Sequence, residues 1–369
     1  MKRFFFVLVM IMVSLVLHGC GAEKAEQQAP AAKAEAAPSQ PSQRWRMVTS
    51  WPPNFPVFQE GVQRFAKDVE TMSQGRIKTQ VFAGGELVPP LQVFDAVSQG
   101  TVEIGHAAAY YWSGKIPAAQ FFTTMPFGMS AQGMNTWLYS GGGLELWREV
   151  YAPHNLVPFP MGNTGVQMGG WFNKRIDSVA DLKGLKMRIP GLGGQVLAKA
   201  GGNPVLLPGG EIYSALERRT IDATEWVGPY HDQRLGLPRI AKYYYYPGWQ
   251  EPGPSLELIV NKKVWDGLPA DLQRIVEVAA QATDAWMLTE FEAKNLAALE
   301  EIKQGKAEIL PFPDDVIATL QQLTEEALQE QAQKDPQFAK VYQVYRDYQA
   351  KYEGWAAISE NAYQQALKR

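Results

Sequence analysis

The chain has 369 residues and carries 35 Lys and Arg against 38 Asp and Glu, which gives a formal net charge of −3 at pH 7. The sequence contains no run rich in Lys or Arg, and this argues against a nucleic-acid-binding protein. Its single cysteine, Cys20, has no second cysteine to pair with, so the fold cannot depend on an internal disulfide.

The N-terminus has the composition of a bacterial targeting segment. Two basic residues precede an apolar run over 4–17, which is too short to cross a membrane as a mature helix. The run ends in Leu-His-Gly-Cys, which resembles a lipoprotein box and predicts a lipid anchor on Cys20; an ordinary signal peptide that happens to contain a cysteine is the alternative. We expect a signal peptide over 1–19 and, because the next stretch is rich in Ala, Gln, Glu, Lys and Pro, a flexible leash over 20–43. In both cases the mature protein works outside the cytoplasmic membrane.

From residue 44 onward, predicted strands alternate with predicted helices. Apolar side chains recur at spacings of three and four between Phe58 and Met72, as on one face of an amphipathic helix. The first elements are expected in the order strand 44–50, helix 58–72, strand 76–82, helix 91–99 and strand 101–106. Alternation of this kind predicts an α/β fold with a parallel sheet that is covered by helices on both faces.

The stretch from Asp181 to Gly194 contains the clearest binding signal. A strand is predicted over 186–190, a glycine-rich loop follows it, and a helix is predicted over 195–200. Arg188 therefore lies at the carboxyl end of a strand, where open α/β sheets bind their ligands. A guanidinium group beside a helix N-terminus suits a small carboxylate, because its fork matches both oxygens. The alternative is that Arg188 is an ordinary surface arginine.

Two segments of the chain resemble each other. Residues 94–103 and 213–222 both have the pattern of a helix, a tight turn and a strand, and each leads into a polar and aromatic segment. The simplest account is a pair of similar lobes that face each other, and chance similarity of two ordinary α/β units is the alternative. A strand predicted over 166–174, with Gln167 near its start, opens the second of these regions.

The C-terminal part is predicted to be mostly helical. A strand over 255–261 is expected to return the chain to the first lobe, and a long helix over 270–302 is expected next because this run contains no Pro or Gly. A short strand over 307–310 and helices over 314–333 and beyond Asp335 complete the chain. These last helices could brace both lobes or pair with a second copy of the chain.

Motifs for enzymatic chemistry are scarce, whereas oxygen donors suited to a cation are present. The chain has no phosphate-binding glycine–lysine motif, no His-Glu-x-x-His zinc motif and no Gly-x-Ser-x-Gly nucleophile motif. Gln167, Glu225 and Glu251 offer side-chain oxygens of the type that binds Na⁺, Ca²⁺ or Mg²⁺. A cation between the two carboxylates and an anionic ligand would remove their mutual repulsion. Taken alone, each of these residues is more often a solvated or capping side chain.

Several motifs together resemble those of a known family. The solute-binding proteins of TRAP transporters, the DctP type, have motifs similar to Asp181-Leu-Lys-Gly-Leu-Lys-Met-Arg-Ile-Pro, Gln99-Gly-Thr-Val-Glu-Ile-Gly and Arg219-Thr-Ile-Asp-Ala-Thr-Glu-Trp. The branch that binds 2-oxo acids such as pyruvate with a metal ion resembles this chain in Val166-Gln-Met-Gly-Gly-Trp-Phe, Ala223-Thr-Glu-Trp-Val-Gly-Pro and Trp249-Gln-Glu-Pro-Gly. The resemblance covers the chain from about residue 44 to its end.

This resemblance implies a two-lobe periplasmic-binding-protein-like fold, with α/β lobes joined by hinge strands, a long connecting helix and a helical C-terminus. The lobes would close on the ligand like a hinged trap. The expected division is lobe I over 44–163 and about 252–305, lobe II over 164–251 and about 306–313, and C-terminal helices for bracing or dimerisation over 314–369.

By the same resemblance, Arg188 pairs with the carboxylate of the substrate. The cation, Na⁺ or Ca²⁺, would bridge to the carboxylate and 2-oxo oxygens of the substrate and be held by Gln167, Glu225, Glu251 and the backbone of Trp226. Gln167, Glu225 and Trp226 thereby border the substrate as well. Tyr111, from the first lobe, would close the site.

The implied function is the capture of a small monocarboxylate outside the cytoplasm and its delivery to TRAP membrane permease subunits. The lipoprotein box and leash suit a tethered member of the family, and exchange of a C-terminal helix between subunits would make a homodimer. The chain departs from the family at Arg219, where many members have Gly, and this departure leaves the conformation of that turn open.

Two other functions remain open from the sequence. A periplasmic enzyme acting on a small carboxylate could use Glu225 and Glu251 as acid and base. A structural lipoprotein would bind no small ligand at all. The sequence does not name the carboxylate, because hydroxy acids, oxo acids and branched-chain acids all carry one, and Na⁺ and Ca²⁺ accept the same oxygen donors.

Overall fold

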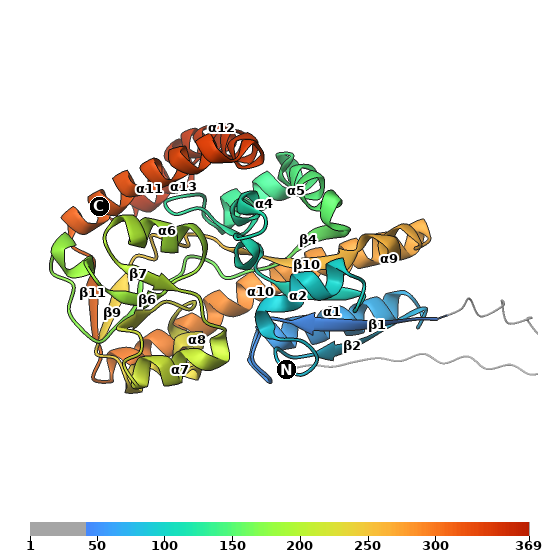
Figure 1. Ribbon diagram of the computed structural model, residues 1–369, viewed down its shortest axis with the longest axis horizontal. Helices are drawn as coiled ribbons and strands as arrows, with labels where there is room; N and C mark the ends of the chain where they lie inside the picture. The colour runs from blue at the N-terminus through green and yellow to red at the C-terminus, as the bar shows by residue number, and fades with distance from the viewer. Residues whose placement is uncertain (1–41, 369) are drawn as a thin grey trace, which may run out of the picture. The chain divides into compact units, whose positions relative to one another are not determined.

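The computed structural model describes residues 42–368. The predicted signal peptide, the lipoprotein box at Cys20 and nearly all of the leash lie outside the described residues. The rest of the chain, Pro41–Arg369, is one compact unit in which strands and helices alternate (Figure 1). Within the described residues, we find no helix that combines the length and the apolar character needed to cross a membrane.

The first sheet contains five strands in the order β2-β1-β3-β10-β4. Their bounds are β1 Gln43–Thr49, β2 Ile77–Phe82, β3 Ile104–Ala107, β4 Leu156–Asn163 and β10 Ser255–Asn261. β1 pairs in parallel with β2 and β3, whereas β10 runs antiparallel to β3 and β4. The predicted parallel pairing therefore holds for β1, β2 and β3, whereas the sheet as a whole is mixed. β4 carries the chain out of this sheet and β10 brings it back, so these two neighbours run in opposite directions.

The second sheet contains six strands in the order β11-β9-β5-β8-β6-β7. Their bounds are β5 Gly170–Phe172, β6 Lys186–Arg188, β7 Asn203–Val205, β8 Ala223–Thr224, β9 Tyr243–Tyr246 and β11 Glu308–Pro311. β6 pairs in parallel with β7 and β8, and β5 runs antiparallel to β8 and β9. Arg188 is the last residue of β6, at the carboxyl end where the sequence predicts it. The residue boundaries of the two lobes stay a prediction.

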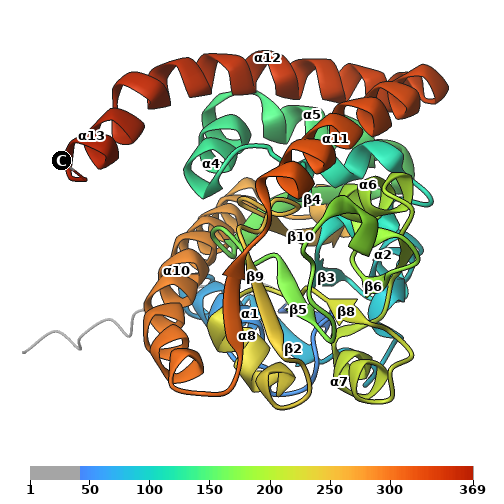
Figure 2. The ribbon, with the colours of Figure 1, turned by 90° about the vertical axis from the view of Figure 1, so that its left-hand side faces the viewer.

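Helices cover both sheets, as Figures 1 and 2 show. Their bounds are α1 Phe58–Met72, α2 Val93–Ser98, α3 Gln120–Thr123, α4 Ala131–Ser140, α5 Gly143–Tyr151, α6 Gly191–Lys199, α7 Gly209–Glu217, α8 Pro229–Arg234, α9 Lys262–Asp266, α10 Ala270–Lys303, α11 Asp314–Lys334, α12 Pro336–Ile358 and α13 Glu360–Ala366. The predicted apolar face of α1 is buried, because Val62, Phe65 and Val69 pack in one core cluster with Trp45 of β1.

One long helix packs beside both sheets (Figure 1). α10 has 34 residues and packs on β4 and α1 at the first sheet and on α8 at the second. Leu272 and Val276, in its first half, lie in the core of the first sheet. Met287 and Phe291, further along, lie in a cluster with Trp226. The apolar residues of the helix thus change partner along its length, and the predicted connecting helix is present.

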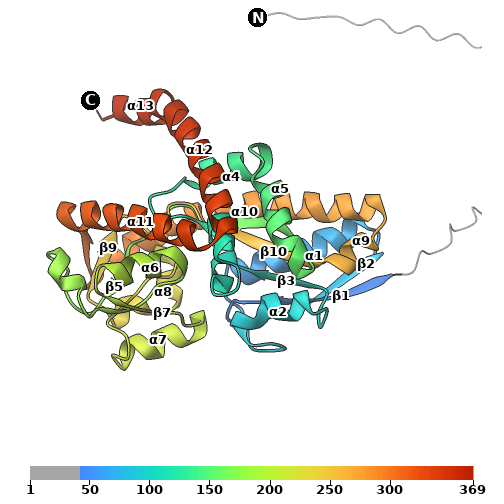
Figure 3. The same cartoon turned by 45° about the horizontal axis from the view of Figure 1, so that its top comes forward.

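The C-terminal helices brace the cores of the two sheets. α11 buries Val316 and Leu320 in the core of the second sheet. α12 buries Phe338 and Tyr345 in the core beside the first sheet. Figures 2 and 3 show α12 leading away from α11 toward α13 and the end of the chain. Bracing, one of the two roles predicted for these helices, is therefore visible within a single chain.

The predicted strand over 166–174 is wrong in its first part. Gln167 lies before β5 in an irregular segment, because Gly165 and Gly170 have φ angles of 71° and 118°, which interrupt an extended chain. The backbone groups of this segment bond to other loops instead; the Gln167 amide, for example, donates to the carbonyl of Glu251 at 3.1 Å. The irregular backbone therefore brings Gln167 to the loop that carries Glu251.

The glycines over 191–194, predicted as a loop, form the first turn of α6. A Cβ atom on Gly194 would lie 2.8 Å from the carbonyl oxygen of Ile189, so a residue without a side chain lets this turn pack directly on the end of β6. The helix therefore begins close behind Arg188 and its N-terminus stands beside the candidate site.

Candidate functional site

Arg188 is fully buried and keeps one donor free. Its Nη1 donates to the carboxylate of Glu225 and, at 3.1 Å, to the backbone carbonyl of the same residue. Its Nε donates to the carbonyl of Leu207 at 3.3 Å, and its Cζ lies 5.1 Å from the ring centroid of Trp226. Nη2 has no hydrogen-bond partner among residues 42–368. A buried guanidinium with a free N–H group is able to bind an anion.

Three side-chain oxygens from different segments are buried without a hydrogen-bond partner. Gln167 precedes β5, Glu225 follows β8, and Glu251 lies in the loop before β10. Each residue is at most 4% exposed. Gln167 Oε1, Glu225 Oε2 and Glu251 Oε2 accept no hydrogen bond within the described part of the chain. A buried acceptor without a partner costs free energy, and a bound cation or ligand would remove that cost for these three oxygens.

Hydrogen bonds fix the orientation of the Gln167 amide. Gln167 Nε2 donates to Thr164 Oγ1 at 3.1 Å, so its Oε1 is the atom left for another partner. The backbone carbonyl of Gln167 accepts from the backbone N–H group of Gly248 at 3.0 Å, and the backbone N–H group of Gln167 donates to the carbonyl of Glu251 as described above. The segment before β5 and the loop before β10 are thus joined at the site.

Trp226 offers a free backbone carbonyl next to Glu225. Glu225 N donates to the carbonyl of Arg188 at 3.2 Å, and the carbonyl of Val227 accepts from Met168 N at 3.0 Å. Between these two anchors, neither backbone group of Trp226 makes a hydrogen bond with any described residue. The carbonyl of Trp226 is therefore a fourth oxygen that could serve as a ligand.

Two carboxyl groups and one guanidinium share this buried site. Burial raises the pKa of Glu251, and the neighbouring Glu225 carboxylate raises it further. Burial also raises the pKa of Glu225, against the opposing attraction of Arg188. Burial alone would lower the pKa of Arg188, but the attraction of nearby anionic groups, led by Glu225, outweighs burial and raises it. One guanidinium does not balance two carboxylates, so a bound cation would allow both to ionise.

Two tyrosines that follow β3 of the first sheet reach this site. Burial raises the pKa of Tyr111 to about 12, while the nearby guanidinium of Arg188 acts in the opposite direction. Burial also raises the pKa of Tyr110, and the carboxylate of Glu251 adds to that rise. Tyr111, the residue that the family resemblance implies, therefore lies close to Arg188. Tyr110, which the sequence analysis did not select, lies close to Glu251.

Aromatic rings surround the indole of Trp226. The ring centroids of Trp51, Phe55 and Phe58 lie 6.5, 6.0 and 6.2 Å from it, each in an edge-on arrangement. The imidazole of His231 lies 4.6 Å from both phenylalanine rings. The segment after β1 thus packs on residues that follow β8, and the candidate site lies under an apolar cover.

The oxygen set suits a hard cation better than a transition metal. It consists of one amide, two carboxylates and one backbone carbonyl, from Gln167, Glu225, Glu251 and Trp226. Oxygen-only ligands of this kind are those of Na⁺ and Ca²⁺, whereas zinc and copper sites use His or Cys. Among residues 42–368, no group of three or more His, Cys, Asp and Glu lies close enough to hold a metal ion by itself. The oxygens of a bound acid would complete the set.

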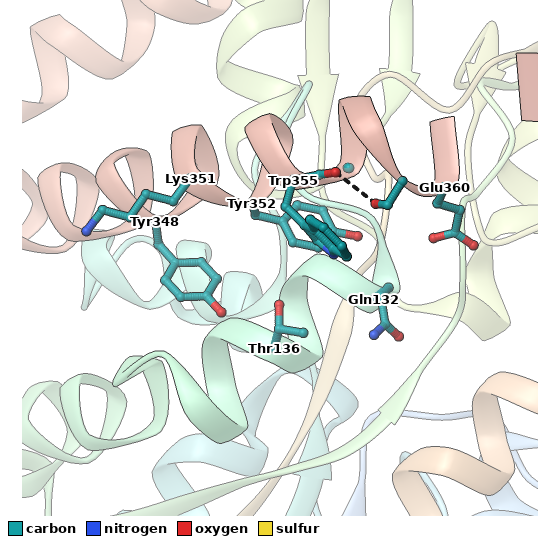
Figure 4. A pocket seen from close by; sticks show the side chains of 9 residues that line it. Gln132, Thr136, Tyr348, Lys351, Tyr352, Trp355 and Glu360 are labelled. Atoms are coloured by element: carbon teal, nitrogen blue, oxygen red, sulfur yellow. Dashed lines mark hydrogen bonds between the residues drawn. The ribbon is translucent and has the colours of Figure 1, made fainter. Parts of the chain in front are cut away.

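A separate hollow of about 520 Å³ lies beside the C-terminal helices (Figure 4). Figure 4 shows Tyr348, Tyr352 and Trp355 of α12 directed toward Gln132 and Thr136 of α4. None of the residues that line this hollow belongs to the candidate site. It is a surface feature of the C-terminal helices, and it is distinct from the buried oxygen set.

Three residues around the site were not predicted from the sequence: Trp51, Tyr110 and Asp232. Tyr110 could have been found, because it follows the same strand as Tyr111. Asp232 gives no local signal, since its side chain accepts a hydrogen bond from Trp171, which lies 61 residues earlier in the sequence.

Comparison with known proteins gives the family. Residues 47–335 match the family described as bacterial extracellular solute-binding protein, family 7 (DctP). A monocarboxylate 2-oxoacid-binding periplasmic protein of Nostoc sp. is 48% identical over 324 residues, which cover 88% of this chain and 89% of the relative. Two TRAP periplasmic solute-binding proteins of known structure are each 44% identical, with TM-scores of 0.86 over 88% of this chain and 99% of theirs. The protein of Colwellia psychrerythraea holds calcium and pyruvate, and that of Pseudoalteromonas atlantica holds sodium and pyruvate.

The two sheets, the shared helix and the helical C-terminus are those of a periplasmic solute-binding protein of the TRAP type. The chain belongs to the bacterial extracellular solute-binding protein family 7, the DctP family. Members of this family are extracytoplasmic substrate-binding proteins of transporters and not enzymes. The alternative in which Glu225 and Glu251 act as acid and base is therefore wrong.

Proposed function

We propose that this protein captures a small 2-oxo monocarboxylate, such as pyruvate, together with Na⁺ or Ca²⁺, and delivers it to TRAP membrane permease subunits. The observation that carries this proposal is a set of unpartnered polar atoms in one buried place. One is a donor on Arg188, and the others are acceptors on Gln167, Glu225 and Glu251. The pyruvate and the cations held by the two relatives of known structure agree with this chemistry.

Arg188 is the group that would hold the carboxylate of the acid. Its Nη1 already bonds to Glu225, and its Nε is held by the carbonyl of Leu207, so the plane of the guanidinium is fixed and Nη2 is the donor left over. A charge-assisted hydrogen bond at a buried site is screened much less than one at the surface. Tyr111, close to Arg188, would offer its hydroxyl to the same carboxylate.

The cation would be held by oxygens of Gln167, Glu225 and Glu251 and by the carbonyl of Trp226. When bound, it would supply the positive charge that lets both carboxylates ionise and that attracts the oxygens of the acid. Glu225 would contact both Arg188 and the cation, because its Oε1 accepts from Arg188 while its Oε2 is free. A 2-oxo acid presents a carboxylate oxygen and a keto oxygen side by side, which suits a site with one free guanidinium donor and several free oxygens.

Residues from both sheets border this site, and this supports closure around the ligand. Tyr111 follows β3 of the first sheet, whereas Arg188 ends β6 of the second. A ligand that touches both groups gains the two contacts together only in the closed arrangement, so it stabilises that arrangement. The permease would then recognise the closed form.

A thermal-shift panel tests this function. The purified protein is heated with 2-oxo, 2-hydroxy or dicarboxylic acids in buffers that contain Na⁺, Ca²⁺ or neither ion. Because a ligand that binds only the folded state raises the melting temperature, we expect a rise with 2-oxo monocarboxylates that requires one of the cations. A flat panel, or a rise limited to dicarboxylic acids, would contradict the proposed substrate class.

Attachment of the protein to a membrane through Cys20 is a further part of the proposal. A lipid on this residue, followed by the leash over 20–43, would tether the folded unit near the permease. Cys20→Ala should move the protein from the membrane fraction to the soluble periplasmic fraction, and mass spectrometry of the wild-type protein should show the lipid. An unmodified Cys20 in mature protein would contradict the anchor.

The exposed end of the C-terminal helices supports a homodimer. Trp355 and Ile358 of α12 and Tyr363 of α13 are 65%, 75% and 63% exposed. Large apolar side chains gathered on an exposed surface are typical of an interface, and a second copy of the chain would cover them. Light scattering should give the mass of a dimer for the wild-type protein and of a monomer for Trp355→Ser/Ile358→Ser. A monomeric wild-type protein would contradict this part of the proposal.

A further inference from the structure

A buried carboxylate outside the candidate oxygen set lies directly behind it. Asp232, on α8, is 1% exposed. Its Oδ1 accepts from Val227 N at 3.2 Å, and its Oδ2 accepts from Trp171 Nε1 at 3.0 Å and from the Tyr244 hydroxyl at 2.7 Å. Each oxygen of Asp232 therefore accepts at least one hydrogen bond from the protein, and we do not count Asp232 among the candidate ligands.

The three donors come from three different segments of the second sheet. Trp171 belongs to β5 and Tyr244 to β9, two strands that pair antiparallel, and their rings stack with 4.1 Å between centroids. Val227 belongs to the segment after β8 that carries Glu225 and Trp226. Asp232 thus ties the segment with the candidate ligands to a rigid aromatic pair on neighbouring strands.

The hydrogen bond from Val227 N to Asp232 fixes the orientation of the peptide group between Trp226 and Val227. The N–H of Val227 and the C=O of Trp226 belong to the same planar unit, and in a trans peptide these two groups point in opposite directions. When Asp232 accepts the N–H group, the Trp226 carbonyl must therefore point away from Asp232. That carbonyl accepts no hydrogen bond from any residue the structure describes.

We propose that Asp232 is a positioning residue for the cation: by accepting the Val227 N–H group, it aims the carbonyl of Trp226 toward the oxygens of Gln167, Glu225 and Glu251. This inference rests on the proposed function only for the presence of a cation, and it holds for any acid that is bound with it. A carboxylate is needed at position 232, because an asparagine has an NH2 group in place of one of the two oxygens. That group would face one of the three donors and could not accept its hydrogen bond.

The experiment compares cation binding in Asp232→Asn with a matched control. Asp284 is also a buried aspartate whose Oδ1 accepts a backbone N–H, that of Gly162, at 2.8 Å, but it belongs to α10 and not to the site. Ca²⁺ alone is titrated into each purified protein by calorimetry, and pyruvate is then titrated at saturating Ca²⁺. We expect Asp232→Asn to lose roughly 10- to 100-fold in Ca²⁺ affinity, as is usual for groups that orient metal ligands. Asp284→Asn should keep the wild-type Ca²⁺ affinity even where its melting temperature falls as far.

Trp171→Phe and Tyr244→Phe keep the test open if Asp232→Asn does not fold. Each removes one donor and leaves the carboxylate in place, so each should weaken Ca²⁺ binding by less than Asp232→Asn. Wild-type Ca²⁺ affinity in Asp232→Asn, or in both aromatic variants where that protein cannot be made, would overturn the inference. An equal loss in Asp284→Asn would also overturn it, because general loosening would then explain the effect.

The calorimetry also separates this inference from the proposed function. A wild-type protein that binds Ca²⁺ but no pyruvate would overturn the proposed substrate, and the Ca²⁺ affinities of the variants would still decide the role of Asp232. A wild-type protein that binds neither Ca²⁺ nor Na⁺, with or without pyruvate, would overturn both the cation site and the inference.

Discussion

Arg188 and Glu225 form a fully buried ion pair in which each partner keeps one polar atom free. The free atoms are Nη2 of the guanidinium and Oε2 of the carboxylate. A buried pair is stabilising only when its remaining donors and acceptors are also satisfied. The two residues therefore satisfy each other on one side only. A bound acid would accept from the free Nη2, and a cation bound with it would contact the free Oε2.

Truncation of Arg188 should remove most of the affinity for the acid. We expect Arg188→Ala to weaken pyruvate binding by roughly 2–5 kcal/mol, because the acid loses its charged partner and Glu225 is left unpaired. Calorimetry in the presence of the cation measures this loss. Arg175→Ala is the control, since Arg175 pairs with Asp177 and Glu308 at the surface, and its affinity should not change. Wild-type affinity in Arg188→Ala would remove this residue from the site.

Removal of the cation should weaken acid binding in the same way for any 2-oxo acid. Replacing Na⁺ with tetramethylammonium and chelating Ca²⁺ leaves the guanidinium of Arg188 to balance two carboxylates, so we expect weaker pyruvate binding in calorimetry. Glu251→Gln removes one of those charges and should make binding less dependent on the ion. Glu211→Gln, at an exposed position of α7, should behave like the wild-type protein. Indifference of the wild-type affinity to both ions would contradict the cation site.

Local signals in the sequence were enough to predict the positions of Arg188 and Glu225. Each follows from the end of a short strand, and strand ends depend on nearby residues. The helix over 270–302 was predicted almost to its ends, because an uninterrupted run without Pro or Gly leaves few alternatives.

Features that depend on distant pairing could not be predicted. β4 carries two prolines and is buried along its whole length, so it shows none of the alternation by which a half-buried strand is recognised. The irregular segment at Gln167 is held in place by backbone hydrogen bonds to loops more than 50 residues away, such as that of Glu251, and these partners could not be read from the local sequence. Glu251 and Tyr111 were placed at the site mainly through the family resemblance, because nothing in the sequence around either residue predicts that it lies beside Arg188.

The buried carboxyl group of Glu257 should make stability fall as the pH rises. Burial raises the pKa of Glu257 to about 8, although Trp112 and Tyr151 donate hydrogen bonds that oppose the rise. The folded state therefore holds this proton more tightly than the unfolded chain, whose glutamates titrate near their ordinary pKa of about 4.3. Between these two values, the free energy of unfolding decreases with increasing pH by up to about 1.4 kcal/mol per pH unit.

Glu257→Gln isolates this effect, because glutamine keeps the shape of the protonated acid and does not titrate. Urea unfolding at pH 5, 6, 7 and 8 should show a smaller dependence on pH for the variant than for the wild-type protein. Glu211→Gln, which changes an exposed glutamate, should keep the wild-type slope. Parallel slopes for Glu257→Gln and the wild-type protein would show that Glu257 does not carry a raised pKa.

Two glycines of neighbouring helices should respond in opposite ways to alanine. A Cβ atom on Gly194 would meet the backbone oxygen of Ile189 at 2.8 Å, whereas one on Gly210 would meet nothing within 4 Å. Gly194→Ala should therefore cost about 1–3 kcal/mol of stability, as overpacking does, and weaken acid binding because α6 begins directly behind Arg188. Gly210→Ala, in α7, should gain roughly 0.5–1 kcal/mol from the better helix former and leave binding unchanged. Urea unfolding and calorimetry on both variants test the pair, and equal effects of the two substitutions would contradict the close packing of α6 on β6.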